Sequence, residues 1–127
     1  NAAFELGSGD FTLEAFVNFS SLPSTNGYQA TIFGKWASSN CSYELYLYNS
    51  SGSYLIYLTY TTNGTTAINV GVSWTPTAGT WYHVACVRSG SNLYFFVNGT
   101  QQGTTQAISG TIYDGTAILT VGAFNPC

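Results

Sequence analysis

The sequence predicts an all-β fold, an antiparallel β-sandwich of two sheets, and three observations point to it. No stretch shows the 3.6-residue repeat of apolar positions that marks an amphipathic helix. Short stretches in which aromatic and β-branched residues alternate with others recur at a spacing of roughly eight to twelve residues. Clusters of Gly, Asn, Ser and Pro separate these stretches, and such clusters are typical of turns. Regularly spaced antiparallel strands of this kind form sandwiches.

The first clear strand is expected over residues 11–19. Its odd-numbered positions are all apolar, whereas most positions between them are polar, so one face of the strand should be buried. The segment around Pro23 ends it. Further strands are expected over residues 29–36, 43–48, 54–60, 67–73, 81–88, 93–97 and 118–124, with a short opening strand over residues 3–6.

Two Asn-Gly pairs predict tight hairpins. Asn63-Gly64 and Asn98-Gly99 each follow an alternating apolar run. Asn-Gly is the preferred pair of a two-residue type I′ turn, because both central residues of that turn need a positive φ. A slightly longer turn is expected over residues 49–52.

The length and composition set limits on the domain organisation. The 127 residues are enough for one domain, so residues 1–127 are expected to form a single module. The chain contains no Met and begins at Asn1, which predicts that it is processed or excised from a longer protein. The hydrophobic share of 45% predicts that the chain folds. No apolar run approaches the length that spans a bilayer, so no membrane span is expected.

Charged side chains make up only 6% of the sequence, with two basic and five acidic residues. Two basic residues cannot neutralise a row of phosphates, so nucleic acid is excluded as a main partner. Most of the surface polarity must come from Ser, Thr, Asn and Gly. No carboxylates cluster along the chain, so no metal and no cofactor is expected.

Residues 81–90, Trp-Tyr-His-Val-Ala-Cys-Val-Arg-Ser-Gly, are followed by a strand that closes in Val97-Asn98-Gly99. This hairpin resembles the centre of laminin-G-like, concanavalin A-like jelly-roll domains. That family shows Trp, then His-Val-Ala, then Arg and Gly, and then a strand ending in Val-Asn-Gly or Val-Asp-Gly. Other segments are similar to the family's first, second and late strands, namely residues 9–17, 32–36 and 119–122.

The resemblance covers nearly the whole chain and implies a lectin-like jelly roll whose members mostly bind glycans or proteins outside cells. Members also occur in phage tail and fibre proteins, and some bind calcium. The family usually continues after its late strand with a strand that pairs back near the N-terminus, whereas this chain stops at Cys127. The edge at residues 3–6 is therefore expected to be covered by further polypeptide or by a neighbouring subunit through β-augmentation.

The sequence thus favours a non-catalytic recognition module, extracellular or on a virion surface, with a glycan or protein surface as its partner. The alternative is a structural subunit of a virion, fibre or filament. A glycoside hydrolase is a distant third, because such enzymes need two carboxylates close together and no strand carries two acids. Glu14 and Glu44 lie on separate strands. His83, the one histidine, is expected to pack on a central strand rather than to catalyse.

Tyrosines are concentrated in the hairpin over residues 43–60. If Leu45 and Leu47 point inward, the residues between them point outward. The candidate ligand-binding residues are therefore Tyr46, Tyr48 and Tyr57, with Glu44. Exposed tyrosines stack on sugar rings or anchor protein interfaces. The alternative is that the rings pack across strands and stabilise the sheet.

Three cysteines leave at least one unpaired. Cys86 lies in the middle of a strand and is expected to be a buried free thiol. Cys41 and Cys127 fall outside the strands and could form a disulfide if the chain ends meet. Five Asn-x-Ser/Thr sequons would accept glycans in a host that glycosylates them, and these are at Asn18, Asn40, Asn49, Asn63 and Asn98.

Overall fold

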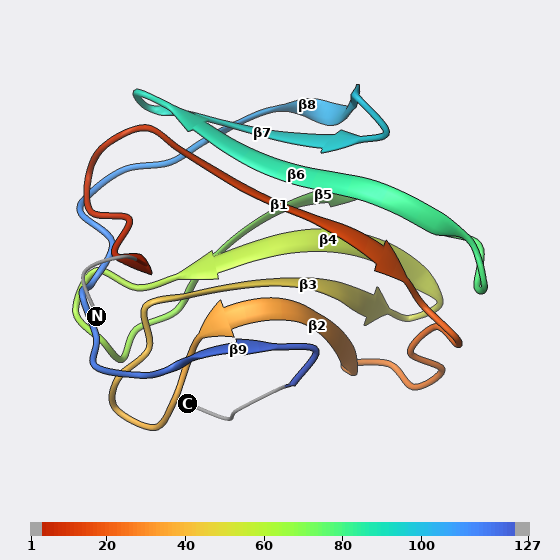
Figure 1. Ribbon diagram of the computed structural model, residues 1–127, viewed down its shortest axis with the longest axis horizontal. Coiled ribbons are helices and arrows are strands. Elements are labelled where there is room, and N and C mark those ends of the chain that lie inside the picture. Colours follow the sequence, from red (N-terminus) through yellow and green to blue (C-terminus); the bar gives the residue numbers. More distant parts are fainter. Residues whose placement is uncertain (1–3, 124–127) are drawn as a thin grey trace.

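The computed structural model describes residues 4–123, and within them nine strands form two antiparallel sheets (Figure 1). One sheet has the order β1-β6-β7-β8 and the other β5-β4-β3-β2-β9. This architecture confirms the predicted antiparallel two-sheet sandwich. The strands are β1 (Phe11–Asn18), β2 (Gln29–Lys35), β3 (Tyr43–Ser50), β4 (Ser53–Tyr60), β5 (Ile68–Ser73), β6 (Trp81–Ser89), β7 (Asn92–Val97), β8 (Thr100–Ala107) and β9 (Leu119–Val121).

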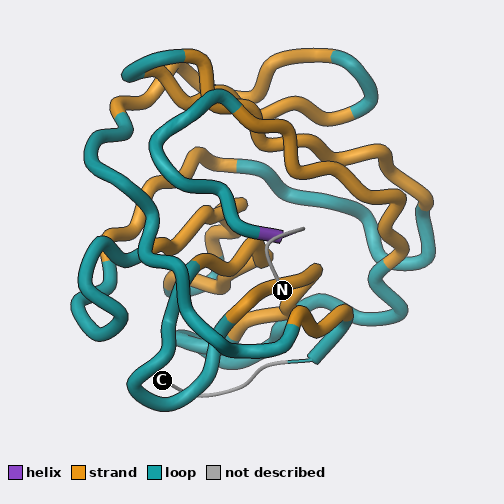
Figure 2. Tube along the Cα trace, turned by 60° about the vertical axis from the view of Figure 1, so that its left-hand side comes forward, coloured by secondary structure: helices purple, strands orange, loops and turns teal. Residues whose placement is uncertain are grey.

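The hydrophobic core fills the space between the two sheets, because alternation sends every second side chain of each strand inward. Figure 2 shows the two layers of strands with long loops closing the end near the termini. Among the described residues, no helix is long and apolar enough to cross a membrane. The fully or almost fully buried members of the core include Leu45, Leu47, Ile56 and Leu58 from one sheet and Val84, Cys86, Leu93 and Phe95 from the other.

Strand β8 was not predicted, because its sequence Thr-Gln-Gln-Gly-Thr-Thr-Gln-Ala carries almost no apolar residue. It pairs with β7 at the edge of the four-stranded sheet, and most of its side chains are exposed. A strand that buries little has no hydrophobic alternation to reveal it. Its position depends instead on the turn that precedes it.

That turn is the predicted Asn98-Gly99 hairpin, and it is confirmed. Asn98 and Gly99 have φ values of 49° and 78°, and Val97 pairs with Thr100 across them. Positive φ at both central residues is the requirement of a type I′ turn, which matches the right-handed twist of the two strands.

The second predicted hairpin, at Asn63-Gly64, is wrong. Seven residues separate β4 from β5, and of this pair only Gly64 has a positive φ. The Asn63 side chain organises the wider loop, because its Oδ1 accepts hydrogen bonds from the backbone N–H groups of Thr65 and Thr66, at 3.0 and 2.8 Å. An Asn side chain that caps its own loop competes with the two-residue turn.

The turn expected over residues 49–52 is shorter than predicted. Ser50 pairs with Ser53, so the connection between β3 and β4 has two residues, Ser51 and Gly52, with φ values of 54° and 88°. The Asn49 side chain supports this tight turn, because its Oδ1 accepts a hydrogen bond of 2.8 Å from the Gly52 N–H.

The opening strand expected over residues 3–6 is wrong for residues 4–6, which form no strand, and Ala3 lies outside the described residues. Isolated contacts hold this segment instead of a ladder. The Tyr43 hydroxyl donates to the Phe4 carbonyl at 3.1 Å, and the N–H of Ile112 donates to the Gly7 carbonyl at 3.0 Å. Among the described strands, β1 and β9 therefore end the two sheets on one side.

Cys86 is free and fully buried on β6, and burial raises the pKa of its thiol. Because the thiolate is the reactive form, we expect no labelling of Cys86 by a thiol reagent at neutral pH in the native protein and complete labelling after denaturation. Mass spectrometry with and without denaturant measures both. Rapid labelling of Cys86 under native conditions would mean that β6 does not lie at the centre of the sandwich.

Candidate functional site

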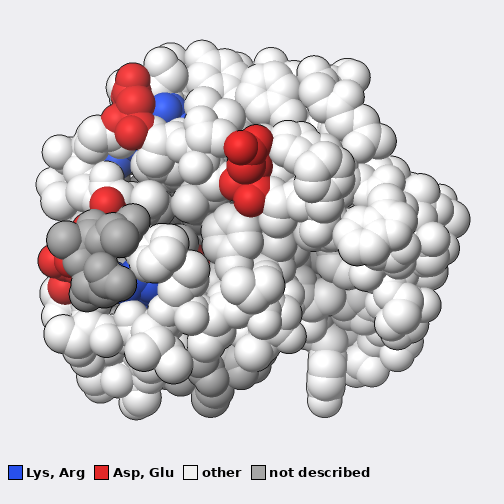
Figure 3. All heavy atoms as spheres, in the orientation of Figure 1, with Lys and Arg blue, Asp and Glu red and all other residues white. Residues whose placement is uncertain are grey.

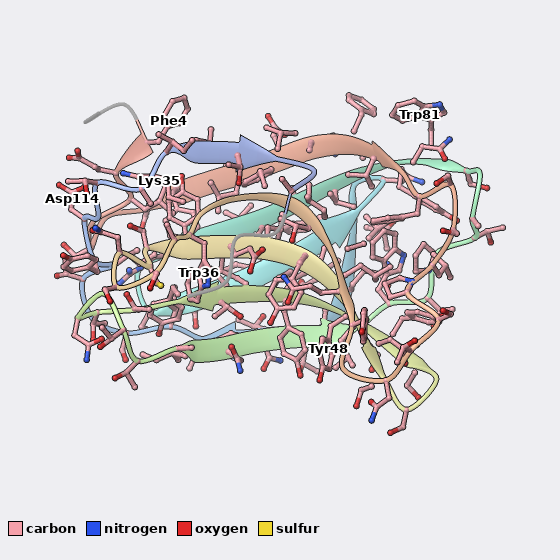
Figure 4. All side chains as sticks on the ribbon, turned by 90° about the horizontal axis from the view of Figure 1, so that it is seen from below. Phe4, Lys35, Trp36, Tyr48, Trp81 and Asp114 are labelled. Atoms are coloured by element: carbon pink, nitrogen blue, oxygen red, sulfur yellow. The ribbon has the colours of Figure 1, made fainter. Side chains whose placement is uncertain are left out.

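Three tyrosines of β3 and β4 come together on the outer face of the five-stranded sheet. The ring centroids of Tyr46 and Tyr48 each lie 5.7 Å from that of Tyr57, and those of Tyr46 and Tyr48 lie 6.3 Å apart. We call these three residues the tyrosine cluster. Figure 4, which views the molecule from below, shows Tyr48 toward the end of this sheet away from Lys35. The predicted grouping of the three side chains is thus present.

The expected exposure is wrong for two members of the predicted site. Tyr46 is 7% exposed and Glu44 is 3% exposed. The physical reason is that the tyrosine rings lie against each other and against the sheet. The Tyr46 hydroxyl hydrogen-bonds to Thr59 at 2.8 Å, and Tyr57 lies over Gly71, where a Cβ atom would overlap its ring. The cluster fits the alternative interpretation, cross-strand packing that stabilises the sheet.

Glu44 is held by two neighbours on β2. The side chains of Gln29 and Thr31 donate hydrogen bonds to Glu44 Oε1 at 3.0 and 2.7 Å. Burial raises the pKa of the Glu44 carboxyl, and these two hydrogen bonds partly oppose the rise. This carboxylate is therefore part of a hydrogen-bonded network within the sheet.

The raised pKa of Glu44 predicts a pH dependence. A carboxyl whose pKa is higher in the folded than in the unfolded state stabilises the fold below its unfolded pKa and loses that contribution as the pH rises through the folded pKa. We therefore expect Glu44→Gln, which keeps an acceptor oxygen, to raise the melting temperature at pH 7. The difference from the wild type should vanish below about pH 4. Thermal unfolding at several pH values measures it, and a destabilised variant at pH 7 would contradict the argument.

A second group of aromatic side chains lies on the outer face of the four-stranded sheet. Phe16 on β1 and Trp81 on β6 are 74% and 66% exposed. In the register of these strands, Phe16 lies opposite His83 and Asn18 lies opposite Trp81. The ring centroids of Phe16 and His83 are 5.1 Å apart, with the rings tilted.

A polar pair completes this surface. His83 Nε2 lies 3.0 Å from Glu14 Oε2, and both side chains are partly or largely exposed. We call Glu14, Phe16, Trp81 and His83 together the β1–β6 face. The expectation that His83 lies on a central strand is correct, but its side chain lies on the outer surface and not in the core. Large aromatic rings beside hydrogen-bonding groups can hold a ligand that is part apolar and part polar.

Sequence reasoning missed the β1–β6 face, although one signal was available. Phe16 occupies a position on β1 whose neighbours two residues away, Glu14 and Asn18, are polar and point outward. A single exposed aromatic residue is common on protein surfaces, so this signal indicates an interaction site only together with the exposed Trp81 on the same face. Nothing in the sequence indicated that Trp81 is exposed, because Trp81 begins a strand whose middle residues are buried.

The two acids considered for glycoside cleavage lie on opposite faces of the molecule. Glu14 belongs to the outer face of the four-stranded sheet and Glu44 to the outer face of the five-stranded sheet, with the core between them. They therefore do not form the close pair that glycoside hydrolysis uses. In residues 4–123, no three His, Cys, Asp or Glu side chains are grouped closely enough to hold a metal ion.

Among the sequons, the expectation is wrong for Asn49. Its side chain is buried, and its Nδ2, the atom to which a glycan would be attached, donates a hydrogen bond of 2.6 Å to the Pro23 carbonyl. Glycosylation of the others stays a prediction. Asn18, Asn63 and Asn98 are exposed, and Asn40 is partly exposed.

The predicted disulfide involves a residue that the structure does not describe. Cys41 is disulfide-bonded and buried. Cys127 lies outside the described residues, so the pairing of these two cysteines stays a prediction.

A hollow lies between the two sheet edges formed by β1 and β9. It has a volume of about 360 Å³, and apolar side chains line most of it, including Leu13, Phe33, Leu119 and Val121. We call it the edge groove. Val121, with the neighbouring Ile118, is among the exposed large hydrophobic residues of the described chain.

The sequence matches a model of a known protein family. A family model for laminin-G-like domains, described as the concanavalin A-like lectin/glucanases superfamily, matches residues 1–125. Among curated proteins, no match is found.

Proposed function

Because the chain belongs to the concanavalin A-like lectin/glucanase superfamily, we propose that it is a non-catalytic module that binds glycans on an extracellular or virion surface. The observation that carries the proposal is the exposure of Phe16 and Trp81 beside polar side chains. Exposed aromatic rings that lie together on one face mark a surface that can contact a partner, and sugar rings are a chemical match for them.

The superfamily includes both lectins and glucanases, so binding must be distinguished from hydrolysis. The placement of Glu14 and Glu44 on opposite faces supports the non-catalytic assignment, because both hydrolytic mechanisms require two carboxyl groups on either side of one bond.

An array of neutral and acidic glycans, with the purified chain as probe, tests the proposal. We expect retention on a subset of the glycans. We also expect no release of reducing ends when the same polysaccharides are incubated with the protein. Absence of binding across the array would contradict glycan recognition. Reducing ends that are released by the wild type, but not by Glu14→Gln or Glu44→Gln, would show that the protein is an enzyme.

A second candidate function is that of a structural subunit that assembles through its sheet edges, and the edge groove favours it. Among the described strands, β1 and β9 end their sheets beside an apolar hollow, and such edges are the feature that β-augmentation uses. Sedimentation of the wild type and of Val121→Lys distinguishes the two functions. A subunit should self-associate at micromolar concentration and lose this association in the variant, whereas a free-standing lectin module should sediment as a monomer in both cases.

A further inference from the structure

We propose that the β1–β6 face is the glycan-binding site and that it takes a neutral pyranose, a sugar without a carboxylate. This inference rests on the proposed glycan-binding function and adds to it the position of the site and the class of the ligand. It starts from the register of two neighbouring strands.

Phe16 and Trp81 belong to adjacent cross-strand pairs on one outer face. Phe16 pairs with His83, and the next pair two residues further along is Asn18 with Trp81. Residues two apart on a strand lie about 7 Å from each other, and paired strands lie about 5 Å apart. The four side chains thus surround one small area, which a single sugar ring can cover. Figure 4 shows Trp81 standing out from the body of the molecule at one end of the sheet.

The aromatic rings of this area have free faces. Phe16 and Trp81 are the most exposed aromatic side chains among the described residues, whereas the rings of the tyrosine cluster lie against each other. The face of an aromatic ring is negative and attracts the weakly positive C–H groups that a pyranose presents on one side. More ring surface is therefore open to a ligand at Phe16 and Trp81 than at Tyr46 of the tyrosine cluster.

Hydrogen-bonding groups stand beside these rings. One oxygen of Glu14 contacts His83, and the carboxylate keeps further lone pairs toward solvent because its side chain is mostly exposed. These lone pairs can accept hydrogen bonds from sugar hydroxyls, and hydrogen bonds to an ionised acceptor are the stronger kind. The exposed amides of Asn18 and Asn98 add donors nearby, and Asn98 is anchored because its Oδ1 accepts a hydrogen bond from the His83 backbone N–H at 2.9 Å.

The charge of the site selects a neutral ligand. Its one carboxylate, Glu14, repels the carboxylate of a uronic or sialic acid. Both basic side chains of the sequence are committed elsewhere, because Lys35 lies 3.7 Å from Asp114 and Arg88 binds two backbone carbonyls. Figure 3 shows that charged atoms gather on one half of the visible surface, while the other half is uncharged.

Two variants and a matched control test the site. Binding is measured by calorimetry with the array-selected glycan and with the corresponding methyl hexopyranoside, and glucuronic acid serves as the acidic probe. We expect Trp81→Ala and Phe16→Ala each to weaken binding by about tenfold or more. Tyr28→Ala removes an equally exposed tyrosine from the loop before β2, and should change affinity less than about twofold.

A measurement on the unaltered protein does not depend on the folding of any variant. The sequence has one histidine, so its ring signals in a proton NMR spectrum belong to His83. Adding the neutral sugar should shift these signals in a saturable way, and glucuronic acid should leave them unchanged.

The possible results separate this inference from the proposed function. If the protein binds glycans but the His83 signals stay in place and Trp81→Ala binds as the wild type does, the site is wrong and the function stands. Tighter binding of glucuronic acid than of the neutral sugar overturns the ligand class. If the wild type binds no glycan at all, the proposed function fails first.

Discussion

Phe95→Ala is expected to lower the free energy of unfolding by about 3 to 5 kcal/mol. Phe95 is 1% exposed and lies on the inner face of β7, where it pairs with Cys86 of β6. Removing the ring loses the free energy gained by burying its apolar surface. It also leaves a cavity between the sheets, because close-packed neighbours collapse only partly into the space. Equilibrium unfolding in urea measures the loss.

Phe16→Ala is the matched control for this substitution, since it removes the same ring from an exposed position. Its expected effect on the free energy of unfolding is within about 0.5 kcal/mol. Equal losses for the two variants would show that the inner and outer faces of the four-stranded sheet are wrongly assigned. The control also shows whether a variant of the β1–β6 face stays folded in the binding experiments.

Arg88→Ala is expected to lower the free energy of unfolding by about 2 to 4 kcal/mol. Arg88 is a buried charged residue on the inner side of β6. Its Nε donates to the Gly90 carbonyl at 3.0 Å, and its Nη1 donates to the Gly110 carbonyl at 3.1 Å. Removing the guanidinium leaves both carbonyls without this donor and breaks the link between β6 and the loop after β8.

Arg88→Lys tests whether the two hydrogen bonds of the guanidinium matter in addition to its charge. A lysine ammonium keeps the charge but cannot reproduce the planar fork that reaches two carbonyls, so an intermediate loss is expected. Urea unfolding of both variants gives the comparison. A lysine variant as stable as the wild type would mean that the second carbonyl contact contributes nothing.

The predictions from the sequence were wrong at two places for reasons that lie in the local structure. Strand β8 has no hydrophobic alternation, and it forms because the Asn98-Gly99 turn directs the chain back along β7. The Asn63 side chain binds backbone N–H groups of its own loop, so that Asn-Gly pair does not form the tight hairpin that Asn98-Gly99 forms. The second outcome depends on side-chain contacts that composition and spacing do not reveal.

The sequence by itself determined the fold class, the strands with apolar alternation and, for β1 and β3, the side of the strand to which a residue points. Leu45 and Leu47 face the core and Tyr46 faces outward, as alternation requires, because a strand places successive side chains on opposite sides whatever surrounds it. The family match over residues 1–125 confirms the resemblance drawn from the hairpin that begins at Trp81.

Only the tertiary structure decided which outward side chains reach solvent. Tyr46 and Phe16 both occupy outward positions, yet Tyr46 is 7% exposed and Phe16 is 74% exposed. Tyr46 is covered because the paired strand β4 brings Tyr57 and Thr59 against it, whereas the residue paired with Phe16 on β6 is His83, which leaves the ring open. Exposure is set by the residues that strand pairing brings against a side chain, and alternation along one strand contains no information about them.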